Sequence, residues 1–445
     1  MDTDRFRFFV TCARGTEGAL RRELVALRIG SPKGDTGGVW FEGPLRMAPA
    51  VCLHARVAVR VLLQVAAFEA DSSEALYEGT RRVAWTDWLT TKSTLSVHAT
   101  VRGSRQEGEP ERAAATPPAR ERARRGKPGG FSDDRRPRPR EGFGRPVTRT
   151  EPQGLTHSGY AALKVKDAVV DALRDKLGAR PDVDPKNPDV SLVLHLAGVQ
   201  AGLFLDLAGE PLHRRGYRVA MTDAPLKETL AAAVLSLGGV RGDEPFVDPM
   251  CGSGTLAIEH ALSARGVPPG LRRKFGFQRW PAFAATMRSD WSAQLEQARA
   301  QVAEAAGNTL APIVCADIGA NELAAARRNA AAAGVEGDIQ FERADVGDVG
   351  DLTRRWPTGT VCTNPPYGER LVARDLGAVY RRMASAFKRL SGWAVVVLSG
   401  NPLLARDLPI KPRISHRLFN GPLEVRLLRY EIDGQPGRPS PADRA

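Results

Sequence analysis

The most informative chemistry in this sequence lies in four consecutive residues, Asn364, Pro365, Pro366 and Tyr367, which follow the short apolar run 360–363. An exocyclic amino group is a poor nucleophile because its lone pair is delocalised into the adjoining π system. The Asn364 side-chain oxygen and the Pro365 carbonyl can accept its two hydrogens and aim the nitrogen lone pair at a methyl group. Pro366 stiffens the loop, and the Tyr367 ring can stack on a base. The run therefore predicts methylation of an amino nitrogen by positioning, with a plain proline-rich turn as the alternative.

A second cluster upstream has the composition of a ligand-binding loop. The apolar pair 246–247 leads into Asp248, and a glycine-rich turn with Gly252, Ser253 and Gly254 precedes a predicted helix. Glycines let the backbone approach a ligand closely, and a helix N-terminus favours an anionic group. The turn lacks both the lysine of a phosphate-binding P-loop and a complete G-x-G-x-x-G pattern, which argues against an ATPase. We expect these residues to hold a nucleotide-like cofactor.

Two further acidic residues follow predicted strands. Asp317 ends one strand, where an acid commonly accepts hydrogen bonds from ribose hydroxyls; its alternative role is to cap the helix at 320–333. Asp345 ends the next strand and is expected to accept a hydrogen bond from an adenine amino group. Asp348 or Asp351 remains open as an alternative for that contact.

Regular alternation of strands and helices positions these side chains in the C-terminal half. Such a pattern predicts a mostly parallel sheet with helices on both faces, closed by a hairpin. The predicted strands are 246–247, 313–316, 339–342, 361–363, 394–399, 414–419 and 424–432, and the predicted helices are 254–264, 321–333 and 376–390.

The N-terminal half alternates less regularly and is predicted to be an α+β region that ends near Gly209. Its apolar run 57–68 is compatible with a strand or a helix end. The other predicted strands are 6–12, 94–101, 190–196 and 202–207, and the predicted helices are 15–27, 76–85 and 160–177.

The segment 104–150 differs in kind, because it is rich in Arg, Pro and Gly and has few apolar groups. It carries 13 Lys and Arg against seven Asp and Glu, so it contributes +6 of the net charge of +13. Too little apolar surface is present to offset the entropy of ordering, so we predict disorder. The segment is either a solvated loop insertion or an arm that grips RNA through its arginines.

Composition bounds the class of protein. The 445 residues suffice for two or three domains, and the charge of +13 favours a polyanionic partner such as nucleic acid. No apolar run reaches the length of a membrane span, and no signal peptide is recognisable, so a cytoplasmic location without membrane contact is expected. The five cysteines and seven histidines show no metal-ligand spacing, so neither a metal nor a disulfide is expected.

These motifs resemble those of class I S-adenosylmethionine (SAM)-dependent methyltransferases. The flanking runs 160–167, 212–218 and 224–231, and the extension of the Asn364 motif to Leu371, are similar to the THUMP-domain RNA methyltransferases. Within that family, the closest similarity is to the bacterial group that methylates guanine N2 in 23S ribosomal RNA, without the second methyltransferase domain that some of its members carry. The resemblance covers nearly the whole chain except the Arg/Pro-rich segment.

The resemblance implies an α/β protein that uses SAM and binds structured RNA. It implies a ferredoxin-like part at 1–55, a THUMP domain at 56–209 with its insertion at 104–150, a Rossmann-like methyltransferase domain at 210–435 and a flexible tail at 436–445. It assigns Asp248, Gly252, Ser253, Gly254, Asp317 and Asp345 to cofactor binding, and Asn364, Pro365, Pro366 and Tyr367 to catalysis.

Three other functions remain to be weighed. A THUMP-type tRNA guanine-N2 methyltransferase would keep every motif above. An adenine-N6 DNA methyltransferase or a protein-glutamine methyltransferase shares the Asn-Pro-Pro-Tyr run but does not account for the basic N-terminal region. A non-catalytic RNA-binding or assembly protein would have no use for intact cofactor residues. The run 215–218 and Lys227 are expected either to contact RNA phosphate or to form interdomain salt bridges.

Overall fold

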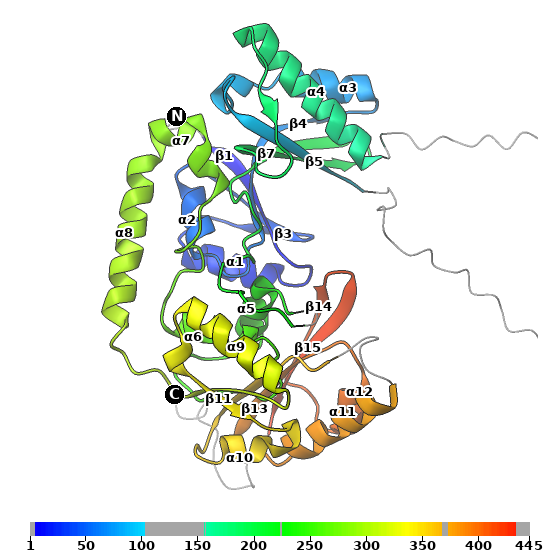
Figure 1. Cartoon of the computed structure of the whole chain (residues 1–445). Coiled ribbons are helices and arrows are strands. Elements are labelled where there is room, and N and C mark those ends of the chain that lie inside the picture. The colour runs from blue at the N-terminus through cyan, green and yellow to red at the C-terminus, as the bar shows by residue number, and fades with distance from the viewer. Residues whose placement is uncertain (1–4, 103–154, 156, 223–224, 367–372, 433–445) are drawn as a thin grey trace, which may run out of the picture.

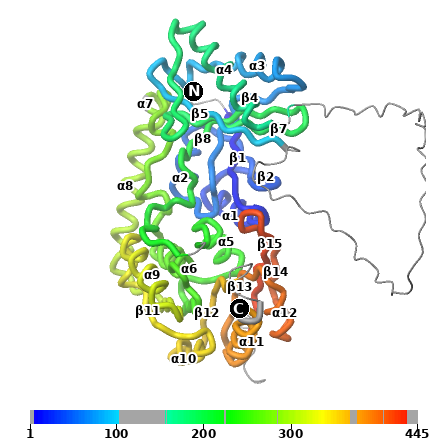
Figure 2. The backbone as a smooth tube through the Cα atoms, turned by 45° about the vertical axis from the view of Figure 1, so that its right-hand side comes forward, coloured from blue at the N-terminus to red at the C-terminus, as the bar shows by residue number. Residues whose placement is uncertain are grey.

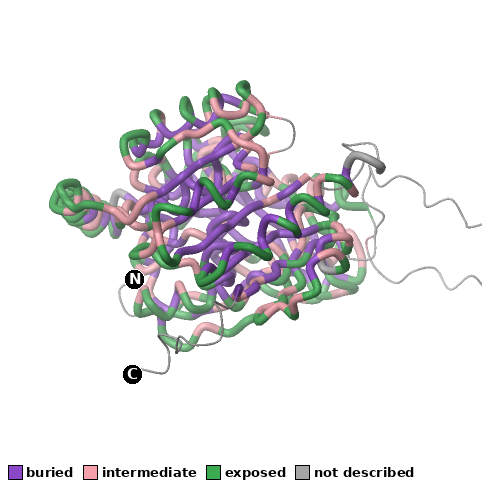
Figure 3. The backbone as a smooth tube through the Cα atoms, turned by 90° about the horizontal axis from the view of Figure 1, so that it is seen from below, coloured by how far each residue is buried: buried purple, intermediate pink, exposed green. Residues whose placement is uncertain are grey.

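The computed structural model describes residues 5–102, 155, 157–222, 225–366 and 373–432, and within these it contains two sheets with their own helices (Figure 1). Three predicted features lie outside the described residues: Tyr367, the Arg/Pro-rich segment 104–150 and the tail 436–445. Buried residues run through the strands of the interior, and exposed residues lie on the outer turns (Figure 3).

The N-terminal part is built on one eight-stranded sheet. Its strand order is β2 (Lys33–Asp35), β3 (Gly38–Gly43), β1 (Phe6–Thr11), β4 (Arg60–Glu69), β8 (Gln200–Asp206), β7 (Val190–Ala197), β5 (Thr94–Arg102) and β6 (Asp182–Val183). The helices here are α1 (Glu17–Ala26), α2 (Met47–His54), α3 (Ser73–Arg81) and α4 (Ser158–Leu177), with the short turn η1 (Trp85–Asp87). The α+β prediction for this half is confirmed.

Strand β4 joins the ferredoxin-like and THUMP parts into this single sheet. It pairs antiparallel with β1 along one edge and with β8 along the other. The open choice between strand and helix for this apolar run is therefore settled in favour of a strand. Because both parts share β4, the boundary expected before this strand divides the sequence but does not divide the sheet into two separate bodies.

The C-terminal part is a seven-stranded, mostly parallel sheet, as predicted. Its order is β11 (Ile339–Arg343), β10 (Ile313–Asp317), β9 (Phe246–Asp248), β12 (Gly359–Thr363), β13 (Trp393–Ser399), β15 (Leu423–Glu431) and β14 (Ile414–Asn420). Only the pairs made by β15 are antiparallel. This arrangement is that of a Rossmann-like fold with a closing hairpin.

Helices flank this sheet, and several were not expected from the sequence. The predicted ones are α6 (Thr255–Ala264), α9 (Ala320–Ala333) and α11 (Ala373–Phe387). The additional elements are α5 (Glu228–Leu237), η2 (Gly276–Arg279), α7 (Pro281–Thr286), α8 (Arg288–Ala305), η3 (Glu336–Asp338), η4 (Val346–Asp348), α10 (Val349–Thr353) and α12 (Leu403–Asp407). Figure 2 shows α8 along the outside of the molecule, between the levels of the two sheets.

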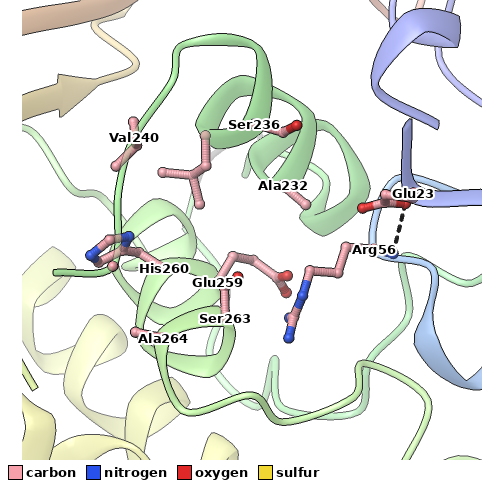
Figure 4. Close-up of a pocket in the computed structure, with 11 residues that line it drawn as sticks. Glu23, Arg56, Ala232, Ser236, Val240, Glu259, His260, Ser263 and Ala264 are labelled. Carbon is pink, nitrogen blue, oxygen red and sulfur yellow. Dashed lines mark hydrogen bonds between the residues drawn. The ribbon is translucent and has the colours of Figure 1, made fainter. Parts of the chain in front are cut away.

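The two parts meet at a polar joint. There Glu23 of α1 accepts backbone hydrogen bonds from Arg56 at 3.1 Å and Val57 at 3.0 Å. A cavity of about 290 Å³ lies beside them, lined also by α5 and α6. Figure 4 shows the side chains of Arg56 and Glu259 pointing toward each other in this cavity. A ferredoxin-like loop also docks on the C-terminal hairpin, where the Phe419 N–H donates to the Arg14 carbonyl at 3.1 Å.

Candidate active site

Strand order brings the predicted site residues to one edge of the C-terminal sheet. Strand β9 lies between β10 and β12, and both pairs are parallel. Asp248 and Asp317 end their strands, and Asn364 directly follows β12. In parallel α/β sheets, ligands bind beyond the carboxyl ends of the strands where the strand order reverses. The order here reverses at β9, so these residues share the place where a ligand is expected.

The glycine-rich turn after β9 is held open by the Asp317 carboxylate. The Gly252 N–H donates to Asp317 Oδ2 at 2.9 Å, and the Gly319 N–H donates to Oδ1 at 2.9 Å. Gly252 has a φ of 53°, and of the described residues only Thr222, through its hydroxyl at 4.0 Å, would come near an added Cβ. The backbone at Gly252 therefore offers an uncrowded approach to a ligand. Both Asp317 oxygens retain lone pairs for further donors.

Gly254 serves packing as well as conformation. Its φ is 81°, and an added Cβ would lie 2.9 Å from the Cβ of Ala326 on α9. The turn therefore sits close against α9, just where α6 begins. This contact fixes the start of α6 relative to the strand ends.

Burial changes the acidity of the strand-end carboxyls. Asp248 is 1% exposed, and burial raises its pKa to about 7, with the nearby Asp317 adding to the rise. Burial also raises the pKa of Asp317, opposed by the N–H groups of Gly319 and Gly252. The Asp248 carboxyl is bonded to the Met250 N–H at 3.2 Å. Asp248 thus shapes the turn from within rather than facing solvent.

Arg218 clamps the same turn, and its role differs from the prediction. Its guanidinium donates to Ser253 Oγ at 2.9 Å and to Thr255 Oγ1 at 3.1 Å. It also pairs with Glu228 of α5 at 2.8 Å. The Ser253 hydroxyl oxygen therefore accepts a bond within the protein, and its O–H remains able to donate to a ligand.

Of the two roles left open for the run 215–218, phosphate contact does not fit its two arginines, whose guanidinium groups bond within the protein. Arg215 is 6% exposed and donates to the carbonyls of Leu212 at 2.8 Å and Arg56 at 2.5 Å. Guanidinium groups committed to buried carbonyls and carboxylates cannot also reach a phosphate. Lys227 is exposed, and for it phosphate contact stays a prediction.

Asn329 of α9 is a positioning residue that the sequence analysis missed. Its Oδ1 accepts from the N–H groups of Val219 and Ala220, each at 2.9 Å. Its Nδ2 donates to the carbonyls of Ala220 at 3.0 Å and Ser253 at 3.1 Å. The side chain is fully buried with every hydrogen-bonding group used. An isolated Asn in an alanine-rich helix carries no sequence signal for such a role.

The Asn364 side chain is poised to accept a hydrogen bond. Its Oδ1 is buried and has no partner within the described part of the chain. A buried acceptor without a donor costs about 1–3 kcal/mol, so the site is shaped for a donor from outside. Tyr380 of α11 donates to the Pro366 carbonyl at 3.1 Å and so holds the loop. The role of Tyr380 could not be predicted from the sequence, because only the folded structure shows that its hydroxyl bonds the Pro366 carbonyl.

Asp345 has structural bonds of its own. Its Oδ1 accepts from the Gly347 N–H at 2.8 Å, and its Oδ2 lies 3.6 Å from Arg382 Nη1. These contacts fix the carboxyl at the end of β11 without exhausting its lone pairs, so contact with an adenine amino group stays a prediction.

Comparison with known families identifies three successive regions of the chain. Residues 7–62 match the RlmL ferredoxin-like domain, 152–206 match the THUMP domain, and 215–427 match the RMKL-like methyltransferase domain. The two N-terminal matches share the sheet that β4 joins, and the third contains all the strand-end residues described above.

Curated relatives are similar along almost the whole chain. The ribosomal RNA large subunit methyltransferase K/L of Syntrophotalea carbinolica is 36% identical over 96% of this chain, which covers 54% of that relative. The protein of the same name from Aeromonas hydrophila is 34% identical, with the same two coverages. The chain thus spans about half the length of the curated relatives it matches.

Solved structures share the arrangement of both parts. A Listeria monocytogenes protein described as a predicted N6-adenine-specific DNA methylase has a TM-score of 0.75 and 27% identity, with 96% of each chain covered. SMU.472, solved in complex with S-adenosylhomocysteine (SAH), has a TM-score of 0.76 and 24% identity, covering 98% of this chain and 100% of its own. The second likeness shows the fold.

The described residues contain neither a membrane-spanning helix nor a metal-binding cluster. No helix among them is long and apolar enough to cross a lipid bilayer. Within the same residues, no three His, Cys, Asp or Glu side chains are grouped so that they could hold a metal ion.

Proposed function

We propose that this chain, which carries an RlmL ferredoxin-like domain, a THUMP domain and an RMKL-like methyltransferase domain, transfers a methyl group from SAM to N2 of a guanosine in 23S rRNA. The observation that carries the proposal is the buried Asn364 Oδ1 at the end of β12, which has no hydrogen-bond partner among the described residues. It lies one strand away from the turn that is open to a cofactor.

The residues at the strand ends fit SAM. The uncrowded Gly252 backbone and the start of α6 suit its carboxylate, because helix N-termini favour anions. The Asp317 carboxylate, fixed by Gly252 and Gly319, suits ribose hydroxyls. Asp345 is proposed to accept from the adenine amino group. When bound, SAM supplies a methyl group on a sulfonium, a leaving group that makes a strong base unnecessary.

The chain contributes to the transfer mainly by orientation. Asn364 Oδ1 and the Pro365 carbonyl are proposed to accept the two amino hydrogens of guanine, which turns the nitrogen lone pair toward the methyl carbon. Tyr380 keeps this loop in place through the Pro366 carbonyl. Tyr367 is proposed to stack on the base. The transfer would form the N–C bond as the methyl–sulfur bond breaks, would leave a neutral thioether, and would release one amino proton to solvent. Orientation of this kind supplies a large part of many rate enhancements.

The N-terminal domains favour an RNA substrate. The Asn-Pro-Pro-Tyr run alone suits any exocyclic amino group, including that of adenine in DNA, whereas a THUMP domain beside a ferredoxin-like domain fits RNA. Among RNAs, we favour 23S rRNA over tRNA because the full-length similarity is to proteins named for the large ribosomal subunit. We place the reaction in the cytoplasm, where bacterial ribosomes are made.

The test is nucleoside mass spectrometry of separated 23S rRNA and tRNA from cells with and without the gene. We expect N2-methylguanosine to fall in 23S rRNA alone and to return with the wild-type gene but not with an Asn364→Ala gene. Loss from tRNA alone would transfer the same chemistry to the rival substrate. No loss in either pool would contradict the proposed activity.

A further inference from the structure

The joint between the two parts contains a cavity that the proposed methyl transfer does not use. It has a volume of about 290 Å³ and lies between α5 and α6, with α1 and the loop at Arg56 at one end (Figure 4). Buried residues of α5 and α6 form its floor, and its rim includes the exposed Ser236 and Ser263. The volume is near the lower end of the range for small-molecule sites, roughly 300–1,000 Å³, and is far above the roughly 30 Å³ share of a single water molecule.

Three of the lining side chains have polar atoms without a hydrogen-bond partner among the residues described. These atoms are Arg56 Nη1, Glu259 Oε2 and His260 Nε2, and all three are buried. Glu259 is 1% exposed and His260 is 4% exposed. Buried polar groups are normally paired, because leaving one without a partner is costly. Three such atoms around one cavity therefore indicate a partner from outside the chain.

The other polar atoms of Arg56 and Glu259 hold these two side chains in place. Arg56 Nη2 donates to the Val267 carbonyl at 2.7 Å. Glu259 Oε1 accepts from the Tyr217 hydroxyl at 3.0 Å and lies 3.5 Å from Arg215 Nε. The two side chains point toward each other (Figure 4). One donor and one acceptor are thus fixed on opposite sides of the cavity.

The charges around the cavity favour a neutral ligand. Burial lowers the pKa of His260 to about 4, so its imidazole is uncharged at neutral pH. A bound anion would lie near the carboxyl groups of Glu23 and Glu259, and a bound cation would lie near Arg56. A neutral group that carries both an acceptor and a donor satisfies Arg56 and Glu259 at the same time.

The rest of the lining favours a flat ring beside that group. Ala232 and Leu235 of α5 contribute apolar surface where this helix packs against α6. The uncharged His260 ring offers a donor or an acceptor to a polar atom of a ligand ring. An aromatic carboxamide combines these features, because its carbonyl suits Arg56, its N–H suits Glu259 and its ring suits the apolar surface.

We propose that this cavity binds a small, neutral, planar molecule bearing a primary carboxamide, with the carbonyl at Arg56 and an amide N–H at Glu259. The site is separate from the transfer site, and the inference does not depend on which RNA is methylated. The ligand would contact Arg56 of the ferredoxin-like domain and also α6, the helix that begins at the cofactor turn. Since only the folded joint forms the cavity, the ligand would stabilise the joint.

The test uses nicotinamide as the probe and the full chain, with excess SAH present to fill the cofactor site. Saturation-transfer NMR titration measures the Kd, which we expect to be on the order of 1 mM or below for so small a ligand. Nicotinate keeps the ring but replaces the amide donor with an acceptor and a negative charge, so it should bind about tenfold more weakly. Absence of saturable nicotinamide binding, or equal affinity for both probes, would overturn the proposal.

Glu259→Gln supplies a sharper test, because it replaces the free acceptor with a donor and keeps an oxygen for Tyr217. The preference should therefore reverse: nicotinamide should bind this variant about tenfold more weakly than the wild type, and nicotinate about tenfold more tightly. Glu296→Gln, at an exposed position of α8, is the matched control and should leave both affinities unchanged. A folded Glu259→Gln protein that still prefers nicotinamide would contradict the assigned geometry.

A crystal of the wild type soaked in nicotinamide decides the question even if Glu259→Gln does not fold. We expect the ring between α5 and α6 and the carboxamide between Arg56 and Glu259. Water alone in the cavity, or nicotinamide bound only elsewhere, would overturn the proposal. Neither result bears on methyl transfer, which the nucleoside measurement on 23S rRNA and tRNA tests separately.

Discussion

At the scale of single residues, the candidate site combines hydrogen-bonded framework side chains with an amide oxygen that has no partner among the described residues. Asn329, Arg218 and Asp317 each have bonds that hold the cofactor turn. The Asn364 amide oxygen, by contrast, has no donor among the residues described. A fold tolerates such a cost where a ligand later supplies the missing partner. Under the proposed function, the missing donor for Asn364 is the substrate, and the bonded groups position the turn.

Replacing Asn364 should remove transfer and spare cofactor binding. Asn364→Ala deletes the acceptor for the amino group, and we expect the transfer rate to fall about a hundredfold or more, as for other single orienting groups. SAM affinity by calorimetry should remain near that of the wild type. Asn308→Ala, at an exposed position, is the control. A large loss of SAM affinity in Asn364→Ala would contradict the role assigned to it.

Replacing Asp317 should act on the cofactor instead. Asp317→Ala removes an anion that orders the Gly252 and Gly319 N–H groups, and we expect SAM to bind about 10- to 100-fold more weakly. Calorimetry measures the change directly, with Asp290→Ala, at an exposed position of α8, as the control. Affinity equal to that of the wild type would leave Asp317 with a purely structural role.

At the scale of elements, sequence predicted those with strong apolar periodicity and missed those without it. Strands β9, β10 and β12 were recognisable as apolar runs, so the residues at their ends were too. Helix α8 was not predicted because only Trp291 and Ala298 of its 18 residues are buried, so its sequence shows no apolar stripe. Helix α2 contains Pro49, which reads as a break. The roles of Asn329 and Tyr380 could not be predicted, because each side chain bonds a residue outside its own helix.

The close contact between the glycine-rich turn and α9 predicts how much a side chain at Gly254 destabilises the protein. Gly254→Ala places a Cβ at 2.9 Å from that of Ala326 and also requires a φ of 81°. Gly266→Ala requires a similar φ of 65° but meets no atom within 4 Å. We expect Gly266→Ala to cost about 1 kcal/mol of unfolding free energy, and Gly254→Ala to cost about 2 kcal/mol more through overpacking. Urea denaturation of both variants measures the difference, and equal losses would show that α9 yields freely.

At the scale of the whole molecule, the two sheets are coupled through buried polar groups. Arg215 donates to the Arg56 carbonyl at 2.5 Å, and Arg56 donates to the Val267 carbonyl at 2.7 Å. Glu23 of α1 bonds the loop that carries Arg56. Charged groups shielded from water thus contribute to the joint beside an apolar core that includes residues of both parts, and their contribution varies with their protonation.

The protonation of Glu23 predicts the direction in which stability changes with pH. Burial raises its pKa from 4.5 to about 7, opposed by the Val57 N–H and by Arg56 and Arg215. Because the folded state binds the proton more tightly than the unfolded state, Glu23 adds stability at low pH that is lost as pH rises through about 7. Glu23→Gln cannot ionise and keeps an oxygen for the two N–H groups.

Denaturation at pH 5 and pH 8 tests this dependence. From pH 5 to pH 8, Glu23→Gln should become more stable relative to the wild type. The other titrating groups are the same in both proteins, so their contributions to the difference cancel. The exposed Glu78→Gln should show no such change. A difference between Glu23→Gln and wild type that is constant with pH would contradict the shifted titration.

The shared strand β4 also sets an order for folding during synthesis. One edge of β4 pairs with β1, which leaves the ribosome earlier, but its other edge waits for β8. Glu69 and Gln200, bonded across this pair, are 131 residues apart. At about 5–20 residues per second, the nascent chain carries an open β edge for roughly ten seconds, and open edges invite intermolecular pairing. A chaperone that covers this edge until β8 emerges should therefore raise the yield of native protein.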